Sequence, residues 1–317
     1  MLRRDFLARL AAGAASSGLA RGAGQAAHPT HPAPRHIVAA PPPKLERIAV
    51  STWSLHNYFR ATRRKDFTLS GPMISLLDFP DIIMDRYKVR HFEFCAVHFG
   101  SIEPAYVQEV RYALVRTRSA IVNMPLDIKE CGPHGTFSDP DPDARKVALD
   151  ALQRWVDVAH QLGAGSVRVG PGNVNPDDLT PTVESYRAIA RYAQSKGIHV
   201  IIENHHDYGT EHPEEMVKLI KLVGPDRVGA LPDFGNFPDE ETRERGLKMF
   251  FPYAHVVCHT KGLEFDANGA ETRYDFPKVM ELAKKAGYRG VYSIEFDGPG
   301  DPYAGIQKTL DELLKYA

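Results

Sequence analysis

The stretch HVIIEN, residues 199–204, decides the fold, because a short apolar run there ends on a single carboxylate, Glu203. The same arrangement recurs three times downstream: GALPDF contains Asp233, HVVCHTK contains His259 and YSIEF contains Glu295. The four residues lie 30, 26 and 36 positions apart, about the length of one strand with its following helix. Apolar runs at that interval are typical of successive parallel strands in a β/α barrel.

Four more strand-like runs precede this stretch, and amphipathic segments separate all eight: the earlier runs are RIAVSTWS, VRHFEFCAV, SAIVNMPLD and GSVRVG. The clearest helical segment covers 144–164, where Gly163 ends a stripe of apolar residues at helical spacing: Val147, Leu149, Leu152, Trp155, Val156 and Ala159. Gly197 ends the next helical segment in the same way. Eight strands alternating with eight helices predict an α/β fold, a single (β/α)8 TIM barrel over residues 47–317.

The N-terminus carries an export pattern. Arg3 and Arg4 form a twin-arginine pair before a small-residue apolar stretch, which predicts a signal peptide over 1–26 and a periplasmic or secreted protein. The alternative is a short amphipathic helix that begins with two arginines. The apolar stretch is too short, and too rich in Gly and Ser, for a stable membrane anchor. Residues 27–46 are Pro-rich and predict an extended tether before the barrel.

The overall composition is that of an ordinary globular protein. The 317 residues are 43% hydrophobic and 25% charged, with a formal net charge of −1. Near-neutral charge provides no electrostatic footprint for nucleic acid, so we expect no nucleic-acid partner. Three widely spaced cysteines form no disulfide framework, and Cys95 and Cys258 lie in strand runs where inert burial is expected. Whether the chain forms a homo-oligomer is left open.

The four strand-end residues have the chemistry of a metal site. In a barrel the carboxyl ends of the strands converge on one mouth, where three carboxylates would repel one another without a cation. Alternation along each strand places the candidates on one face with inward residues: Ile201 with Glu203, Val257 and Lys261 with His259, and Ser293 with Glu295. Oxygen and nitrogen donors in this mixture suit a hard or borderline divalent ion. Taken singly, each residue has the alternative of a structural salt bridge or a helix cap.

The order Glu, Asp, His, Glu on strands five to eight resembles the xylose isomerase-like barrel superfamily, which includes sugar phosphate isomerases and epimerases, D-tagatose 3-epimerase-like enzymes and endonuclease IV. The resemblance covers roughly residues 47–317. It implies that Glu203, Asp233, His259 and Glu295 hold one divalent ion, Mn²⁺ first, with Mg²⁺, Co²⁺ or Zn²⁺ as alternatives. It also implies that Glu203 and Glu295 are the catalytic acid/base pair, acting on opposite faces of a small carbohydrate.

The resemblance implies a sugar isomerase or epimerase that removes a proton next to a carbonyl and passes through an enediolate. A close variant keeps this step but ends in elimination, as a lyase on 3-keto-glycosides. A non-catalytic sugar-binding barrel is a third possibility. A nuclease like endonuclease IV needs extra His and Asp ligands, but Asn236 stands where it needs a strand-six His, and no Asp-x-His follows His259.

Six further residues at strand ends are candidate substrate contacts: His98, Arg168, His205, His206, Asn236 and Lys261. Asn236 replaces the epimerases' strand-six histidine, and it can bind a hydroxyl but cannot take a proton. For Arg168 the alternative is pairing with a core carboxylate, for Lys261 a solvated rim position, and for His98 a histidine with satisfied hydrogen bonds. Glu93 is expected to face inward and to be hydrogen-bonded, with no role assigned.

Overall fold

The computed structural model describes residues 43–69, 71–132, 134–205 and 209–316. The predicted signal peptide and most of the predicted tether therefore lie outside the described residues. The end of that tether differs from the prediction, because Pro43–Arg47 forms the short 3-10 helix η1 within the compact unit Pro43–Ala317. Leu45 is buried there, and the Lys44 ammonium donates to the Leu314 carbonyl at 2.7 Å.

Eight parallel strands form one sheet in the order β6-β5-β4-β3-β2-β1-β8-β7. A parallel bridge between Asp233 and His259 joins the two outer members, with the His259 N–H donating to the Pro232 carbonyl at 2.9 Å. The ring so closed confirms the predicted (β/α)8 TIM barrel. Its strands are β1 (Ile48–Ser51), β2 (His91–Glu93), β3 (Ala120–Leu126), β4 (Ser166–Val169), β5 (His199–Glu203), β6 (Val228–Leu231), β7 (Val257–Gly262) and β8 (Val291–Phe296).

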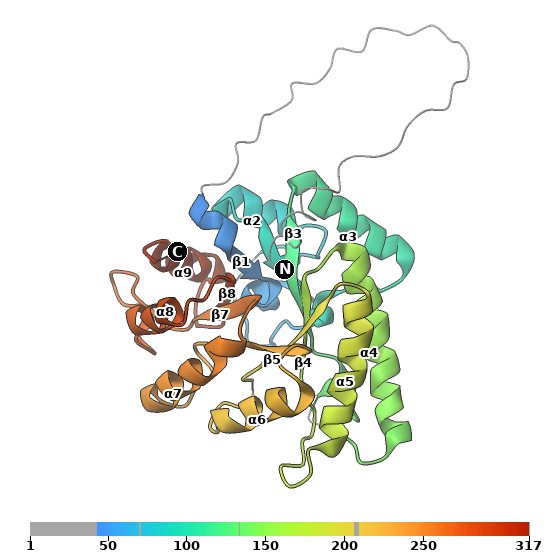
Figure 1. The fold of residues 1–317 in the computed structure, drawn as a ribbon. Helices are drawn as coiled ribbons and strands as arrows, with labels where there is room; N and C mark the ends of the chain where they lie inside the picture. Colours follow the sequence, from blue (N-terminus) through green and yellow to red (C-terminus); the bar gives the residue numbers. More distant parts are fainter. Residues whose placement is uncertain (1–42, 70, 133, 206–208, 317) are drawn as a thin grey trace, which may run out of the picture. The chain divides into compact units, whose positions relative to one another are not determined.

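Eight α-helices of the described residues follow the strands one by one and surround them (Figure 1). They are α2 (Phe79–Tyr87), α3 (Pro104–Thr117), α4 (Pro142–Leu162), α5 (Thr180–Ser195), α6 (Pro213–Val223), α7 (Glu240–Phe250), α8 (Phe276–Lys285) and α9 (Pro302–Leu313). Asp141 and Asp301 cap α4 and α9, and a proline opens each of these two helices, as helix starts favour. Within the described residues, none of these helices is long and apolar enough to cross a membrane.

Short 3-10 segments lie between three strands and their helices: η2 (Thr52–Tyr58), η3 (Ala96–His98) and η4 (Lys129–Cys131). A further one, η5 (Phe251–Tyr253), connects α7 to β7. Helix α4 confirms the predicted end at Gly163, whose φ of +73° is a conformation that favours glycine. One member of the predicted stripe is wrong, because Val147 is 59% exposed. Ala148 is buried in its place, since the stripe that faces the sheet runs through 148, 152, 156 and 159.

Two apolar cores hold the barrel together. The larger lies between the strands and the helices. The smaller consists of Ala49, Val122, Ile201, Leu231 and Val257, and it includes residues of β1, β3, β5 and β7, which are not neighbours in the sheet. Side chains of β1, β3 and β5 can meet only inside the ring, so Ile201 and Val257 face inward as alternation predicts. Glu203 and His259 follow them on the same face, which directs both toward the mouth. Cys95 and Cys258 are buried and free, as predicted.

Candidate metal centre

The four predicted ligands meet at the carboxyl ends of β5 to β8. Their donor atoms all lie within 4.8 Å of one another, and none of the four residues is more than 7% exposed. The Nδ1 atom of His259 lies 3.0 Å from Glu203 Oε1, 3.0 Å from Glu295 Oε2 and 3.4 Å from Asp233 Oδ2. Four residues, the first and last of which are 92 positions apart in the chain, thus form one buried group of oxygen and nitrogen donors.

This donor set fits a divalent ion. Two donors bound to one ion at about 2.1 Å each are about 3.0 Å apart at a right angle and about 3.4 Å apart at the tetrahedral angle. The three spacings around His259 Nδ1 fall in that range. Carboxylate and imidazole donors without thiolates suit a hard or borderline divalent ion. The buried cluster can therefore hold a metal ion.

Asp233 divides its two oxygens between the loop and the site. Its Oδ1 accepts hydrogen bonds from the backbone N–H groups of Gly235 and Asn236 at 2.7 and 3.1 Å, while Oδ2 faces His259 and Lys261. A side chain at Gly235 would place its Cβ 2.8 Å from Lys261 Cβ, so glycine allows this close approach. The sequence Asp-Phe-Gly-Asn after β6 thus positions one carboxylate oxygen for a ligand.

Lys261 lies inside the cluster and is 6% exposed, which differs from a solvated rim position. Its Nζ is 3.1 Å from Asp233 Oδ2, 3.1 Å from Glu295 Oε1 and 2.9 Å from Asn236 Oδ1. Burial alone would lower the pKa of Lys261, but the charges of Asp233 and Glu295 outweigh it and raise that pKa. The ammonium is therefore retained, and its contact with substrate stays a prediction.

Arg168 pairs with two carboxylates. Its guanidinium donates to both oxygens of Asp127 at 2.6 and 3.0 Å, and its Nε lies 2.9 Å from Glu203 Oε2.

Burial would raise the pKa of Glu203, but Arg168 and His259 outweigh it and hold that pKa well below its usual range. For Glu295 burial prevails over Lys261 and His259, so its pKa is raised. The two predicted catalytic glutamates thus occupy electrostatically different places.

The predicted substrate histidines lie in three different situations. Both ring nitrogens of His98 have hydrogen-bond partners, which is the second of its two alternatives. The Thr52 hydroxyl lies 2.8 Å from Nδ1 and the Thr62 hydroxyl 3.0 Å from Nε2. Burial lowers the pKa of His98 to about 3, so the ring is neutral. His205 is half-buried, and its charge helps to lower the pKa of Glu203. His206 lies outside the described residues. Their contacts with substrate stay predictions.

Two residues at the site were not assigned from the sequence. The carboxylate of Glu93 on β2 lies 3.1 Å from Nε2 of His259, and Asp127 pairs with Arg168 as described above. Alternation along the strand predicts that Glu93 faces inward. It does not predict that His259 is the partner, since 166 positions separate the two residues.

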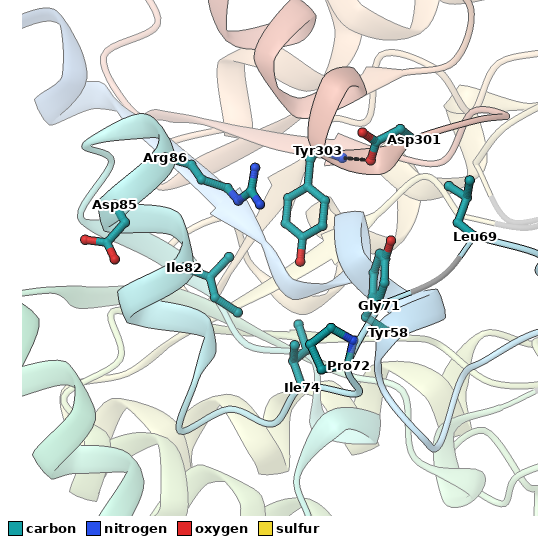
Figure 2. A pocket seen from close by; sticks show the side chains of 10 residues that line it. All are labelled: Tyr58, Leu69, Gly71, Pro72, Ile74, Ile82, Asp85, Arg86, Asp301 and Tyr303. Carbon is teal, nitrogen blue, oxygen red and sulfur yellow. Dashed lines mark hydrogen bonds between the residues drawn. The ribbon is translucent and has the colours of Figure 1, made fainter.

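A separate hollow of about 740 Å³ lies beside η2, α2 and the start of α9 (Figure 2). The guanidinium of Arg86 stands 4.1 Å from the ring centroid of Tyr303, and the ring of Tyr58 lies on the other side of Tyr303. None of its lining residues belongs to the carboxylate cluster. The hollow therefore has no part in the candidate metal centre.

The affinity for metal is expected to rise with pH. Burial would lower the pKa of His259, but Glu93, Glu295 and Glu203 raise it well above its usual value, which favours a doubly protonated ring in the metal-free site. A metal that takes Nδ1 must displace one proton, and below that raised pKa the association constant should increase about tenfold per pH unit. Calorimetric titration with Mn²⁺ at pH 6, 7 and 8 measures this slope. Constant affinity without proton release would contradict it.

The chain belongs to the xylose isomerase-like TIM barrel family, whose model matches residues 86–316. The match covers β2 to β8 with all four candidate ligands and confirms the resemblance inferred from their order.

Among similar proteins, an inosose dehydratase of Glaesserella parasuis serovar 5 (strain SH0165) is 27% identical over 144 residues. That match spans 45% of this chain and 45% of the relative, so the chain spans less than half of the relative's length. A xylose isomerase-like barrel protein from Mycobacterium smegmatis, solved with magnesium, has a TM-score of 0.59 at 19% identity, over 84% of this chain and 95% of that one. The 3-keto-D-glucoside 4-epimerase from E. coli, solved without ligand, has a TM-score of 0.60 at 16% identity, over 84% and 98%. The two solved structures share the fold of this chain.

Proposed function

We propose that this protein is a divalent-metal-dependent sugar isomerase or epimerase, and that it abstracts a proton next to a carbonyl. The observation that carries the proposal is the buried meeting of two glutamates from β5 and β8 with Asp233 and His259 around one point. Arg168 and Lys261 compensate part of the carboxylate charge, but the four oxygen and nitrogen donors still converge on one buried point, which is the arrangement that a divalent ion requires. Two proteins similar to this chain are named 3-keto-D-glucoside 4-epimerase and inosose dehydratase, and both names agree with that chemistry.

Different residues of the site bind the ion, transfer the proton and stabilise negative charge. Glu203, Asp233, His259 and Glu295 would hold the ion, which would supply Lewis-acid polarisation of a carbonyl and so acidify the neighbouring C–H. One of the two glutamates removes that proton, and the other returns a proton to the opposite face or to the neighbouring carbon. The Lys261 ammonium, held by Asn236 and Asp233, can stabilise negative charge on a substrate oxygen.

Elimination is the second candidate reaction. After the same proton abstraction, a leaving group β to the carbonyl departs, as in a lyase acting on 3-keto-glycosides. Similarity to a protein named inosose dehydratase supports this variant, since a dehydratase removes water by elimination. The proton-abstracting glutamate and the metal ligands are the same in both reactions, so the substrate decides between them.

The substrate class we propose is a small carbohydrate without phosphate, and the place of action is outside the cytoplasm. Support for the second part is the twin-arginine pattern at Arg3 and Arg4, since this route exports folded proteins. Phosphorylated sugars are mainly cytoplasmic, which favours neutral ketoses or keto-glycosides.

Incubation of the Mn²⁺-loaded full chain with ketoses and 3-keto-glycosides in D₂O tests the proposal. A substrate is expected to gain deuterium at the carbon next to its carbonyl, and mass spectrometry with NMR distinguishes epimer, isomer and elimination product. Metal-free protein in the same mixture is the control. Sugar binding without deuterium incorporation from any substrate would instead support a non-catalytic sugar-binding barrel.

A further inference from the structure

We propose that Glu93 is a positioning residue that makes Nδ1 of His259 the metal donor by holding a proton on Nε2. The inference rests on the metal site of the proposed function and concerns a residue outside the four ligands.

The His259 ring presents its two nitrogens to different partners. Nδ1 faces the three carboxylates of the metal cluster, whereas Nε2 lies 3.1 Å from Glu93 Oε1 and 3.2 Å from Glu93 Oε2. A carboxylate without a proton can only accept a hydrogen bond, so Nε2 must be the donor. Nδ1 also faces carboxylates, so without an ion both nitrogens can donate; when an ion takes the place of the Nδ1 proton, the remaining ring proton is on Nε2, against Glu93.

Glu93 is itself held in place by the neighbouring strands. The Asn123 side-chain amide donates to Glu93 Oε2 at 2.6 Å, and the Ser166 hydroxyl donates to Asn123 Oδ1 at 2.9 Å. All three side chains are fully buried, and they are paired across β2, β3 and β4 in register. The hydrogen bond from Asn123 therefore holds the carboxylate against the Nε2 side of the His259 ring.

A buried carboxylate behind a metal-binding histidine makes the imidazole a stronger donor, and losing such a partner weakens metal binding by about 10–100-fold. In this chain Glu93 is also the first of the four carboxylates that raise the pKa of His259, before Glu295, Glu203 and Asp233. Its contribution to metal affinity is thus separate from that of the ligands, because it touches only the far nitrogen.

The decisive variants change the partner of His259 but keep the buried volume. In Glu93→Gln a neutral amide replaces the carboxylate, and Mn²⁺ affinity measured by calorimetry is expected to fall about 10–100-fold. The double variant Glu93→Gln, Asn123→Asp exchanges the amide and the carboxylate. It restores the hydrogen-bonded pair between the two positions, but an amide instead of a carboxylate then contacts His259. Its melting temperature is expected to recover while its Mn²⁺ affinity stays low. If Glu93 only supported the fold, affinity would recover together with stability.

Glu312→Gln on α9 is the matched control, because Glu312 is another buried glutamate and it accepts a hydrogen bond from the Glu271 backbone N–H, outside the site. It is expected to change stability without changing Mn²⁺ affinity. Nitrogen-15 NMR of the Mg²⁺-loaded full chain adds a direct readout: the His259 proton should be on Nε2 in the wild type.

A proton on Nδ1, or wild-type Mn²⁺ affinity in both Glu93 variants, would overturn the role of Glu93 and leave the metal site standing. Failure of the wild type to bind Mn²⁺ would overturn the metal site of the proposed function and this inference with it. The two failures are therefore distinguishable.

Discussion

Replacing Glu203 or Glu295 by glutamine is expected to lower turnover on the order of 10²–10⁴-fold, the usual contribution of a positioned general base. Glutamine keeps the side-chain volume and one oxygen donor, but it cannot accept a proton near neutral pH. Both variants should fold and retain some affinity for metal. The rate is measured as product formation from the sugar that gains deuterium in the substrate panel.

The two glutamine variants are also expected to differ in D₂O. The variant that retains the abstracting glutamate should exchange deuterium into substrate without forming product, whereas the other should do neither. Glu312→Gln, which changes a buried glutamate of α9 away from the site, should turn over at the wild-type rate. Wild-type turnover in both Glu203→Gln and Glu295→Gln would show that the base lies elsewhere, among His205, His206 and Lys261.

Alanine at Asp233 or His259 is expected to abolish stoichiometric binding of Mn²⁺, because each residue supplies one of about four protein ligands. In the wild type, metal at 100 times its dissociation constant should stabilise the fold by about 2.7 kcal/mol, and this gain should vanish in the variants. Thermal unfolding with and without Mn²⁺ measures the difference, and calorimetry gives the stoichiometry.

Asp233→Asn is the matched control for this experiment. The asparagine Oδ1 can still accept from the backbone N–H groups of Gly235 and Asn236, so the loop after β6 is kept while the charge is lost. Metal binding that is weakened in Asp233→Asn and absent in Asp233→Ala would separate the ligand role from the loop role. Full metal occupancy in a double Asp233→Ala, His259→Ala variant would rule out the site as described.

The fold and the convergence of the four candidate donors could be predicted because their signals are local. Each strand is an apolar run bounded by turn residues, and alternation along a strand sets which side chains face inward. Glu203 follows Ile201 and His259 follows Val257 on the same face, so their direction needs no knowledge of the rest of the chain. Once the strands are counted, the closed barrel brings their ends together.

The surroundings of the ligands could not be predicted in the same way. Arg168 had two alternatives in the sequence, and the structure pairs it with Asp127 and Glu203. His98 likewise had two alternatives, and in the structure the hydroxyls of two threonines lie within hydrogen-bonding distance of its ring nitrogens. These outcomes depend on distances between side chains of different β/α units, which leave no periodic pattern in the chain.

By itself, then, the sequence determined the barrel, its strand order along the chain and the four donors at its mouth, because hydrophobic periodicity and strand parity are short-range properties. Only the tertiary structure decided that Lys261 lies between Asp233 and Glu295 and that Glu93 contacts His259 from behind. The physical reason is burial. An ionised side chain deep in the barrel must find a partner, and which partner lies within hydrogen-bonding distance is set by how the eight strands close around the interior.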